Sequence, residues 1–316
     1  MKFRSAAVVG CLLLAAEMGF AQSGNKPLAT DAASSARRAI HLVETGQCDQ
    51  ALPSLIRIVP RLHDKQLMYQ AGMAEARCAM ALNQQDAAVD ALMRLKRDFA
   101  DDPEVLYITT HYFSELAERS SQELTAKAPS SIQARRLEAE AFESQGKWDE
   151  AAGIYRGILQ HDPNTPGVHY RLGQVLLAKA GPSGPVDEAK AEFEKELQVD
   201  PSNAAAEFVL GELARRAAEW GPAAEHFRRA TKLDKGFTEA YLALGMSLVA
   251  NGKFAEAVAP LENYVKLQPA DPAGHYQLAI AYSRTGNTAG ATREAALQKE
   301  AAARAAVSPN GEGVRH

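Results

Sequence analysis

The sequence predicts an all-α protein built as a right-handed superhelical solenoid of helix-turn-helix repeats. Its composition is helix-prone, because 46% of the 316 residues are hydrophobic, only 7% are aromatic, and alanine is plentiful. A period is also visible, because Pro129, Pro163, Pro201, Lys235 and Pro269 are separated by 34, 38, 34 and 34 residues. Within each period apolar residues recur at i, i+3, i+4 and i+7, which is one face of an α-helix.

The first 21 residues are predicted to be a signal peptide. Lys2 and Arg4 precede the apolar run AAVVGCLLLAAEMGF, and small residues near Ala21 suit a signal peptidase. We therefore expect a mature chain that begins at Gln22 and is exported to the periplasm or the extracellular space. The alternative is a lipoprotein anchored through Cys11, because VVGC resembles a lipoprotein signal.

The mature chain is expected to begin with a flexible lead-in at residues 22–33 and to continue with a degenerate pair of repeats at 34–102. The first repeat of the pair contains ETGQCDQALPSL, and the second contains LNQQDAAVDAL without a turn glycine. No later window approaches the ~20 apolar residues that a membrane span requires. We therefore predict no transmembrane span in the mature chain.

Residues 103–129 are predicted to form an irregular helical joint. The segment has no glycine, and Asp102-Pro103 is a favourable start for a helix. It is expected to form one long helix, or two short helices broken near Ser120-Ser121.

Residues 130–306 are predicted to hold five consecutive repeats. Turns centred on Gly146, Gly252 and Gly286 are expected to end first helices in the left-handed conformation. The stretch EAALQKEAAARAA near the end is predicted to be a capping helix, and residues 307–316 a disordered tail.

The recurring order of a large residue, Leu-Gly, a further apolar residue, and then Ala, an aromatic and Pro resembles the tetratricopeptide repeat. The resemblance covers Ile132 to about Ala303 as five units and, more weakly, Ala32 to about Ala100 as two more. It implies a scaffold that binds a peptide or helix of a partner protein in a concave groove.

The same resemblance implies which residues line that groove. They occupy two repeating places on the first helices: Tyr170, Gln174, Phe208, Glu212, Leu242, Met246, Tyr276 and Ile280, with Arg215 and Arg284 near the far edge. These residues form an apolar and aromatic strip with few charges, suited to a helix or an extended hydrophobic segment. Related chaperone-binding members grip a C-terminal carboxylate with Lys, Asn and Arg, which are largely missing at these positions.

The sequence offers no sign of catalysis. No two of its eight histidines are three to five residues apart, and it lacks phosphate-binding glycine loops, Cys-x-x-Cys and the Gly-x-Ser-x-Gly elbow. We therefore predict a protein that is not an enzyme, with no metal and no cofactor. The formal charge of −4 argues against nucleic-acid binding.

A non-catalytic protein-protein interaction scaffold of the cell envelope is the favoured function. The alternative is an accessory or substrate-positioning subunit of an envelope enzyme or of an outer-membrane or polysaccharide assembly machine. Neither the partner nor the oligomeric state follows from the sequence.

Cys48 and Cys78 are the cysteines that remain after export. Cys48 begins the second helix of the first repeat, and Cys78 lies late in the next, antiparallel helix, so the two should meet. Two alternatives stay open, a disulfide in an oxidising compartment or two buried thiols.

Overall fold

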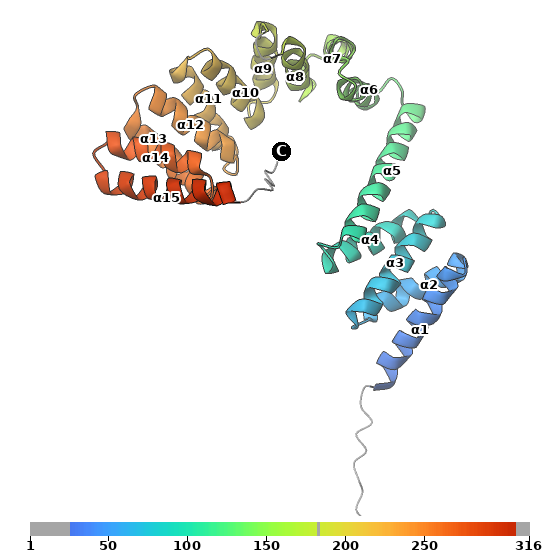
Figure 1. Ribbon diagram of the computed structural model, residues 1–316. Helices are drawn as coiled ribbons and strands as arrows, with labels where there is room; N and C mark the ends of the chain where they lie inside the picture. Colours follow the sequence, from blue (N-terminus) through green and yellow to red (C-terminus); the bar gives the residue numbers. More distant parts are fainter. Residues whose placement is uncertain (1–25, 182–183, 308–316) are drawn as a thin grey trace, which may run out of the picture. The chain divides into compact units, whose positions relative to one another are not determined.

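The computed structural model describes residues 26–181 and 184–307 and is shown in Figure 1. These ranges contain fifteen α-helices and one short 3₁₀-helix, and no strand. The predicted all-α solenoid of helix-turn-helix repeats is confirmed. The chain divides into two compact units, residues 1–120 and 121–316. The predicted signal peptide, Cys11 and nearly all of the predicted tail lie outside the described residues.

Unit 1 holds the two N-terminal hairpins and the first part of a longer helix. Helix α1 contacts α2 and α3, and α3 contacts α4. Alanine and leucine side chains fill its core, because closely approaching helices leave little room for larger groups. The elements are α1 (Lys26–Glu44), α2 (Cys48–Ile58), η1 (Val59–Arg61), α3 (Lys65–Ala81), α4 (Gln85–Asp98) and α5 (Pro103–Lys127).

Helix α1 begins earlier than the sequence analysis predicts. Residues 22–33 were expected to be a flexible lead-in, but the chain is helical from Lys26. Pro27 suits the first turn of a helix, and the alanine-rich stretch that follows has high helix propensity. The helix is held in unit 1 by Ala36 and Ala39, which are 0% and 2% exposed.

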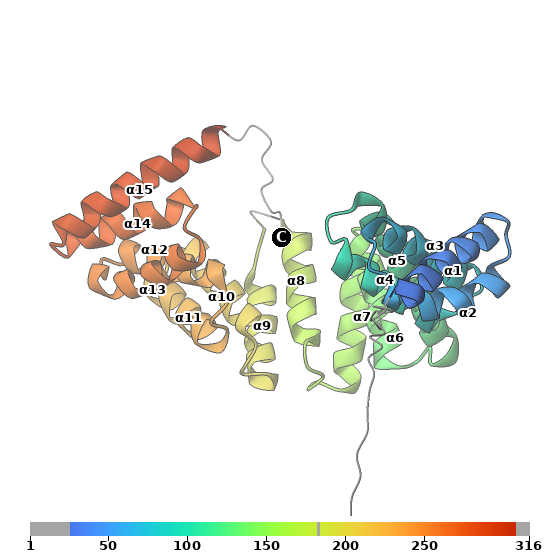
Figure 2. The ribbon, with the colours of Figure 1, turned by 90° about the horizontal axis from the view of Figure 1, so that it is seen from below.

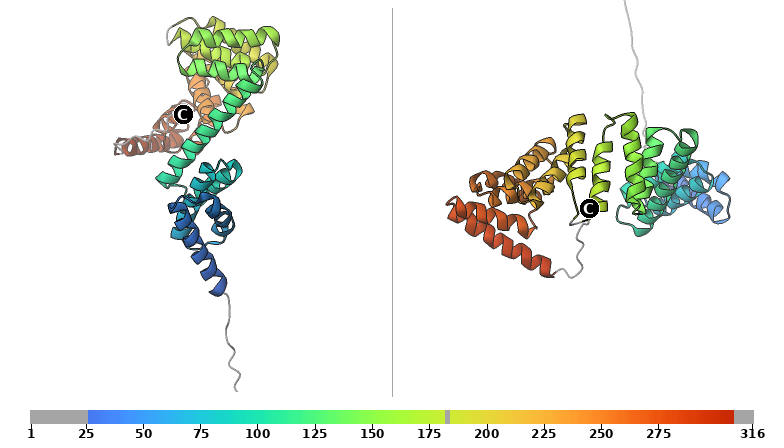
Figure 3. Two further views of the ribbon diagram at one scale, coloured as in Figure 1. Left: turned by 90° about the vertical axis from the view of Figure 1, so that its right-hand side faces the viewer. Right: turned by 90° about the horizontal axis from the view of Figure 1, so that it is seen from above.

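Helix α5 has 25 residues. Its ribbon runs without a break in Figure 3. No break occurs at Ser120-Ser121, where the backbone stays helical and the Ser120 hydroxyl donates to the Leu116 carbonyl oxygen at 2.9 Å. Val105 and Tyr112 pack in the same core as Leu92. Unit 1 therefore extends beyond residue 102, where the repeat pair was expected to end.

Unit 2 is a run of helices from α6 onward in which each helix contacts the next, so that they form five hairpins (Figure 2). The predicted capping segment continues the second helix of the last hairpin without a break. The helices are α6 (Ile132–Ser144), α7 (Trp148–His161), α8 (Val168–Ala180), α9 (Asp187–Val199), α10 (Ala204–Arg216), α11 (Trp220–Leu233), α12 (Thr238–Ala250), α13 (Phe254–Leu267), α14 (Pro272–Arg284) and α15 (Thr288–Val307).

Several of the described turns inside hairpins contain one residue with a left-handed backbone. Gly146, Gly252 and Gly286 have φ of 71°, 73° and 84°, as their place after a first helix predicts. Asn83 and Ala218 occupy this place where glycine is missing, with φ of 54° and 57°. Asparagine tolerates this conformation, whereas alanine is strained in it because its Cβ approaches the backbone.

Candidate functional site

The eight groove residues predicted from the sequence lie on the first helices of four hairpins of unit 2. Helix α10 contacts α12, and α12 contacts α14, so equivalent positions on these three first helices lie beside one another. We call these residues the first-helix face. One row is Tyr170, Phe208, Leu242 and Tyr276, and the other is Gln174, Glu212, Met246 and Ile280.

The α8 end of the first-helix face is polar and internally hydrogen-bonded. The Gln174 amide donates to the Tyr170 hydroxyl at 3.1 Å, and Arg171 beside them forms an ion pair with Glu143 at 3.1 Å. On the neighbouring helix α7, the pKa of Tyr155 is raised to about 12 by burial and by the hydrogen bond that its hydroxyl donates to Glu143. This end therefore carries charges where the sequence predicts few.

On α10, the first-helix face is anchored to the core. The Phe208 ring lies 5.4 Å from the Phe227 ring and 4.8 Å from the Phe237 ring, centroid to centroid. Glu212 accepts two hydrogen bonds from Arg215, at 3.0 and 2.7 Å. Both residues of the face are thus engaged within the chain, and Phe208 is half-buried.

The α12 and α14 end is where apolar side chains reach the surface. Met246 is 37% exposed and Tyr276 is 55% exposed, while Leu242 and Ile280 are half-buried. The Arg284 guanidinium lies over the Phe254 ring at 5.5 Å. The repeat pattern predicts these positions on the first helices. It does not predict which of their side chains are exposed, because the positions are equivalent in every repeat.

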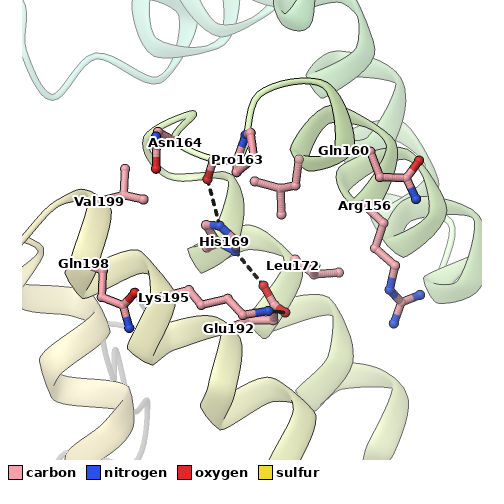
Figure 4. A pocket seen from close by; sticks show the side chains of 11 residues that line it. Arg156, Gln160, Pro163, Asn164, His169, Leu172, Glu192, Lys195, Gln198 and Val199 are labelled. Atoms are coloured by element: carbon pink, nitrogen blue, oxygen red, sulfur yellow. Dashed lines mark hydrogen bonds and ion pairs between the residues drawn. The ribbon is translucent and has the colours of Figure 1, made fainter.

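A cavity of about 590 Å³ opens elsewhere in unit 2, between α7 and α9 with α8 at its base (Figure 4). Several polar side chains converge on this cavity. Its lining includes Arg156, Gln160, Asn164, His169, Glu192, Lys195 and Gln198.

His169 is the buried centre of this cluster. Its Nδ1 lies 2.6 Å from a Glu192 carboxylate oxygen, and its Nε2 lies 3.0 Å from the Pro163 carbonyl oxygen. Both partners are oxygen atoms, so the ring is held on both sides. Burial alone would raise the pKa of Glu192, but hydrogen bonds from Lys195 and His169 lower it.

A histidine–glutamate contact also occurs in other hairpins. The contact between His169 and Glu192 is therefore a structural feature of the repeat. His275 contacts Glu294 at 2.7 Å, and its other nitrogen lies 3.1 Å from the Pro269 carbonyl oxygen. In the α10–α11 hairpin the order is reversed, because Glu207 lies on the first helix and His226 on the second, 2.7 Å apart.

Three of these cross-hairpin contacts share one sequence separation. Glu75 and Arg94 of unit 1, 2.8 Å apart, are 19 residues apart in sequence, as are the two pairs of α10–α11 and α14–α15. His169 and Glu192 are 23 apart, since the turn after α8 is longer. A contact that recurs at equivalent positions belongs to the repeat, so it does not indicate an active site.

The described residues offer neither a metal site nor a membrane span. Across 26–181 and 184–307, no group of three or more His, Cys, Asp or Glu side chains is arranged to hold a metal ion. Among the helices of the same ranges, none has the length and hydrophobicity that crossing a membrane requires.

A disulfide joins Cys48 and Cys78 in unit 1. Their Cα atoms lie 5.0 Å apart, and Cys78 is fully buried. The pairing follows from the antiparallel arrangement of α2 and α3, which brings the start of one helix to the end of the other. Of the two alternatives that the sequence leaves open, the structure has the bonded form.

Comparisons with known proteins identify repeats in this chain. Family models described as tetratricopeptide repeat match residues 123–175, 183–236 and 238–281, so unit 2 contains these repeats. A curated relative, "Protein CTR9 homolog" of Arabidopsis thaliana, is 28% identical over 145 residues, which cover 45% of this chain and 13% of that protein. The chain therefore spans only about an eighth of the length of this relative.

Two groups of solved structures are similar in fold. YrrB, described as a TPR protein with an unusual peptide-binding site, has a TM-score of 0.49 and 21% identity over 57% of this chain and 91% of its own. MamA has a TM-score of 0.49 and 21% identity over 56% of this chain and 94% of its own. At this identity the likeness concerns the fold alone.

Proposed function

We propose that this chain is a non-catalytic protein-interaction scaffold that holds a peptide or helix of a partner protein against the first-helix face of unit 2, in a concave superhelical groove. The observation that carries the proposal is the exposure of Met246 and Tyr276 on contacting helices α12 and α14. Large apolar side chains exposed close together mark interaction surfaces more often than single ones do.

The character of the face indicates the kind of segment that it binds. At its α12–α14 end, Leu242 and Ile280 add apolar surface beside Met246 and Tyr276. Tyrosine contributes a large, rigid ring at low entropic cost, and methionine adapts its shape to the partner. We therefore expect apolar side chains on one side of a helix, or alternate side chains of an extended segment, to lie there.

Site-specific photo-crosslinking in the producing cell tests this proposal. A benzophenone amino acid in place of Tyr276 should capture a partner protein, and the same group in place of Leu267, 47% exposed at the end of the second helix α13, should not. Met246→Ala should weaken capture at 276. If capture is equal at positions 276 and 267 and is unchanged by Met246→Ala, the first-helix face is not the binding surface.

The proposal places the scaffold in the cell envelope, after export and cleavage before Gln22. The Cys48–Cys78 disulfide supports this location, because such bonds persist in oxidising compartments and are rare in a reducing cytosol. Fractionation followed by N-terminal sequencing tests it. A chain that retains Met1 in the cytosol, or a lipid-modified chain beginning at Cys11, would contradict secretion as a free protein.

A further inference from the structure

Three arginines of unit 1 converge on one cavity. It has a volume of about 400 Å³, lies between α1, α2 and η1, and no acidic side chain lines it. The lining residues are Ser35, Arg38, Ala39, Leu42, Ser54, Arg57, Ile58 and Arg61. This concentration of positive charge contrasts with the formal charge of −4 for the whole chain.

The two helices contribute the same pattern of side chains. On α1 the lining residues begin with Ser35 and Arg38, and on α2 with Ser54 and Arg57, so that each helix supplies Ser-x-x-Arg. Residues three and four apart share one face of a helix, and each face therefore presents a hydroxyl and a guanidinium to the same space. Arg61 follows four residues after Arg57.

Two of the three guanidinium groups are held by hydrogen bonds to uncharged groups. Arg38 donates to the Ser35 hydroxyl at 3.0 Å, and the Arg57 Nε donates to the Pro53 carbonyl oxygen at 3.1 Å. Within the described parts of the chain, none of Arg38, Arg57 and Arg61 lies in an ion pair. The larger cavity of unit 2 differs, because there Arg156 and Lys195 are paired with glutamates.

We propose that this cavity, the arginine pocket, binds the phosphate group of an organic phosphate. Planar guanidinium groups match the oxygens of phosphate and form paired, charge-assisted hydrogen bonds with them. Three positive charges suit a phosphate dianion better than a single carboxylate. The apolar side chains of Ala39, Leu42 and Ile58 supply a surface for the organic part, and the volume lies within the range of about 300–1,000 Å³ typical of small-ligand sites.

This site is separate from the first-helix face, and it does not depend on the proposed scaffold function. A phosphate group could be carried by a soluble ester or by a lipid headgroup. Both present the same chemistry to the arginine pocket, so the experiment includes one probe of each kind.

Titration calorimetry with the full mature chain and glycerol 3-phosphate tests the soluble ester. Sedimentation with vesicles of phosphatidic acid in phosphatidylcholine tests the lipid source, with pure phosphatidylcholine as the blank. We expect saturable binding to at least one probe and weaker binding of glycerate, in which a carboxylate replaces the phosphate. Absence of binding to both probes, or equal affinity for glycerate, would overturn the proposal.

The variant Arg57→Gln/Arg61→Gln should lower the affinity for the phosphate probe about tenfold or more. Both side chains are exposed, so the helical content and the melting temperature should be retained. The matched control is Arg37→Gln/Arg216→Gln, which removes the same charge from exposed arginines outside the pocket. If the two double variants lose affinity equally, the effect is one of net charge and the arginine pocket is not the site.

Discussion

Replacing Ala218 with glycine should stabilise unit 2. Ala218 has φ of 57° in the turn between α10 and α11. The left-handed conformation costs an L-residue about 1–2 kcal/mol, whereas glycine adopts it freely. Glycine also raises the entropy of the unfolded chain, which offsets about 0.4–1 kcal/mol of this gain. The expected net increase in the free energy of unfolding is about 1 kcal/mol, or a rise of about 2–4 °C in melting temperature for a unit of this size.

The reverse change at an equivalent turn provides the control. Gly252→Ala introduces a Cβ with nothing within 4 Å, so only the backbone conformation at φ of 73° opposes it. The backbone hydrogen bonds around Ala218 and Gly252 are equivalent, each residue donating to a carbonyl oxygen at 3.0 Å. Gly252→Ala should lower the melting temperature by about the amount that Ala218→Gly raises it. Changes of the same sign in thermal unfolding followed by circular dichroism would refute this reasoning.

Three further predictions concern packing, the disulfide and pH. Gly245→Ala should destabilise unit 2 by about 1–3 kcal/mol in urea unfolding, because its Cβ would lie 2.4 Å from Leu261, which is fully buried; an unchanged midpoint would contradict this. Reducing Cys48–Cys78, which closes a loop of 30 residues, should lower the free energy of unfolding of unit 1 by about 3.5 kcal/mol, and no effect of reductant would disprove it. The pKa of Glu192 in the folded state is lowered from 4.5, so its contribution to the free energy of unfolding is present above pH 4.5 and is lost as pH falls through the lower folded value. Glu192→Gln should therefore reduce the fall of melting temperature at acid pH. A melting-temperature profile parallel to that of the unchanged chain would refute this.

The order of the repeats could be predicted from the sequence because every repeat packs the same kind of interface against the next. A period of 34 residues and a turn glycine locate both helices of a hairpin, and Gly146 and Gly252 have the predicted left-handed φ. Residues 26–33 and 103–127 lie outside that period, so it could not locate their helices. Helix formation at 26–33 agrees with Pro27 and the alanines that follow, whereas 103–127 is tied to unit 1 by the burial of Tyr112, which the period does not encode.

The candidate sites were less predictable, since they depend on exposure and on contacts between repeats. Phe208 and Tyr276 hold equivalent places, yet Phe208 contacts the rings of Phe227 and Phe237, whereas Tyr276 is 55% exposed. The arginine pocket was missed altogether. Its signal was the repeated Ser-x-x-Arg of residues 35–38 and 54–57, which acquires meaning only once α1 and α2 are known to face each other.

The reversed order of the histidine–glutamate pairs bears on how similar repeats avoid incorrect partners during folding. If α8 formed a hairpin with α11 instead of α9, two imidazoles, His169 and His226, would face each other at the shared position. The complementary error, α10 with α9, would oppose the carboxylates of Glu207 and Glu192. Either exchange would replace a hydrogen-bonded imidazole–carboxylate pair with two like groups, and a buried polar group that loses its partner costs about 1–3 kcal/mol, so each exchange is penalised where an unreversed pair would allow it. The reversal between these two neighbouring hairpins thus favours the native pairing of α8 with α9 and of α10 with α11 within an otherwise repetitive chain.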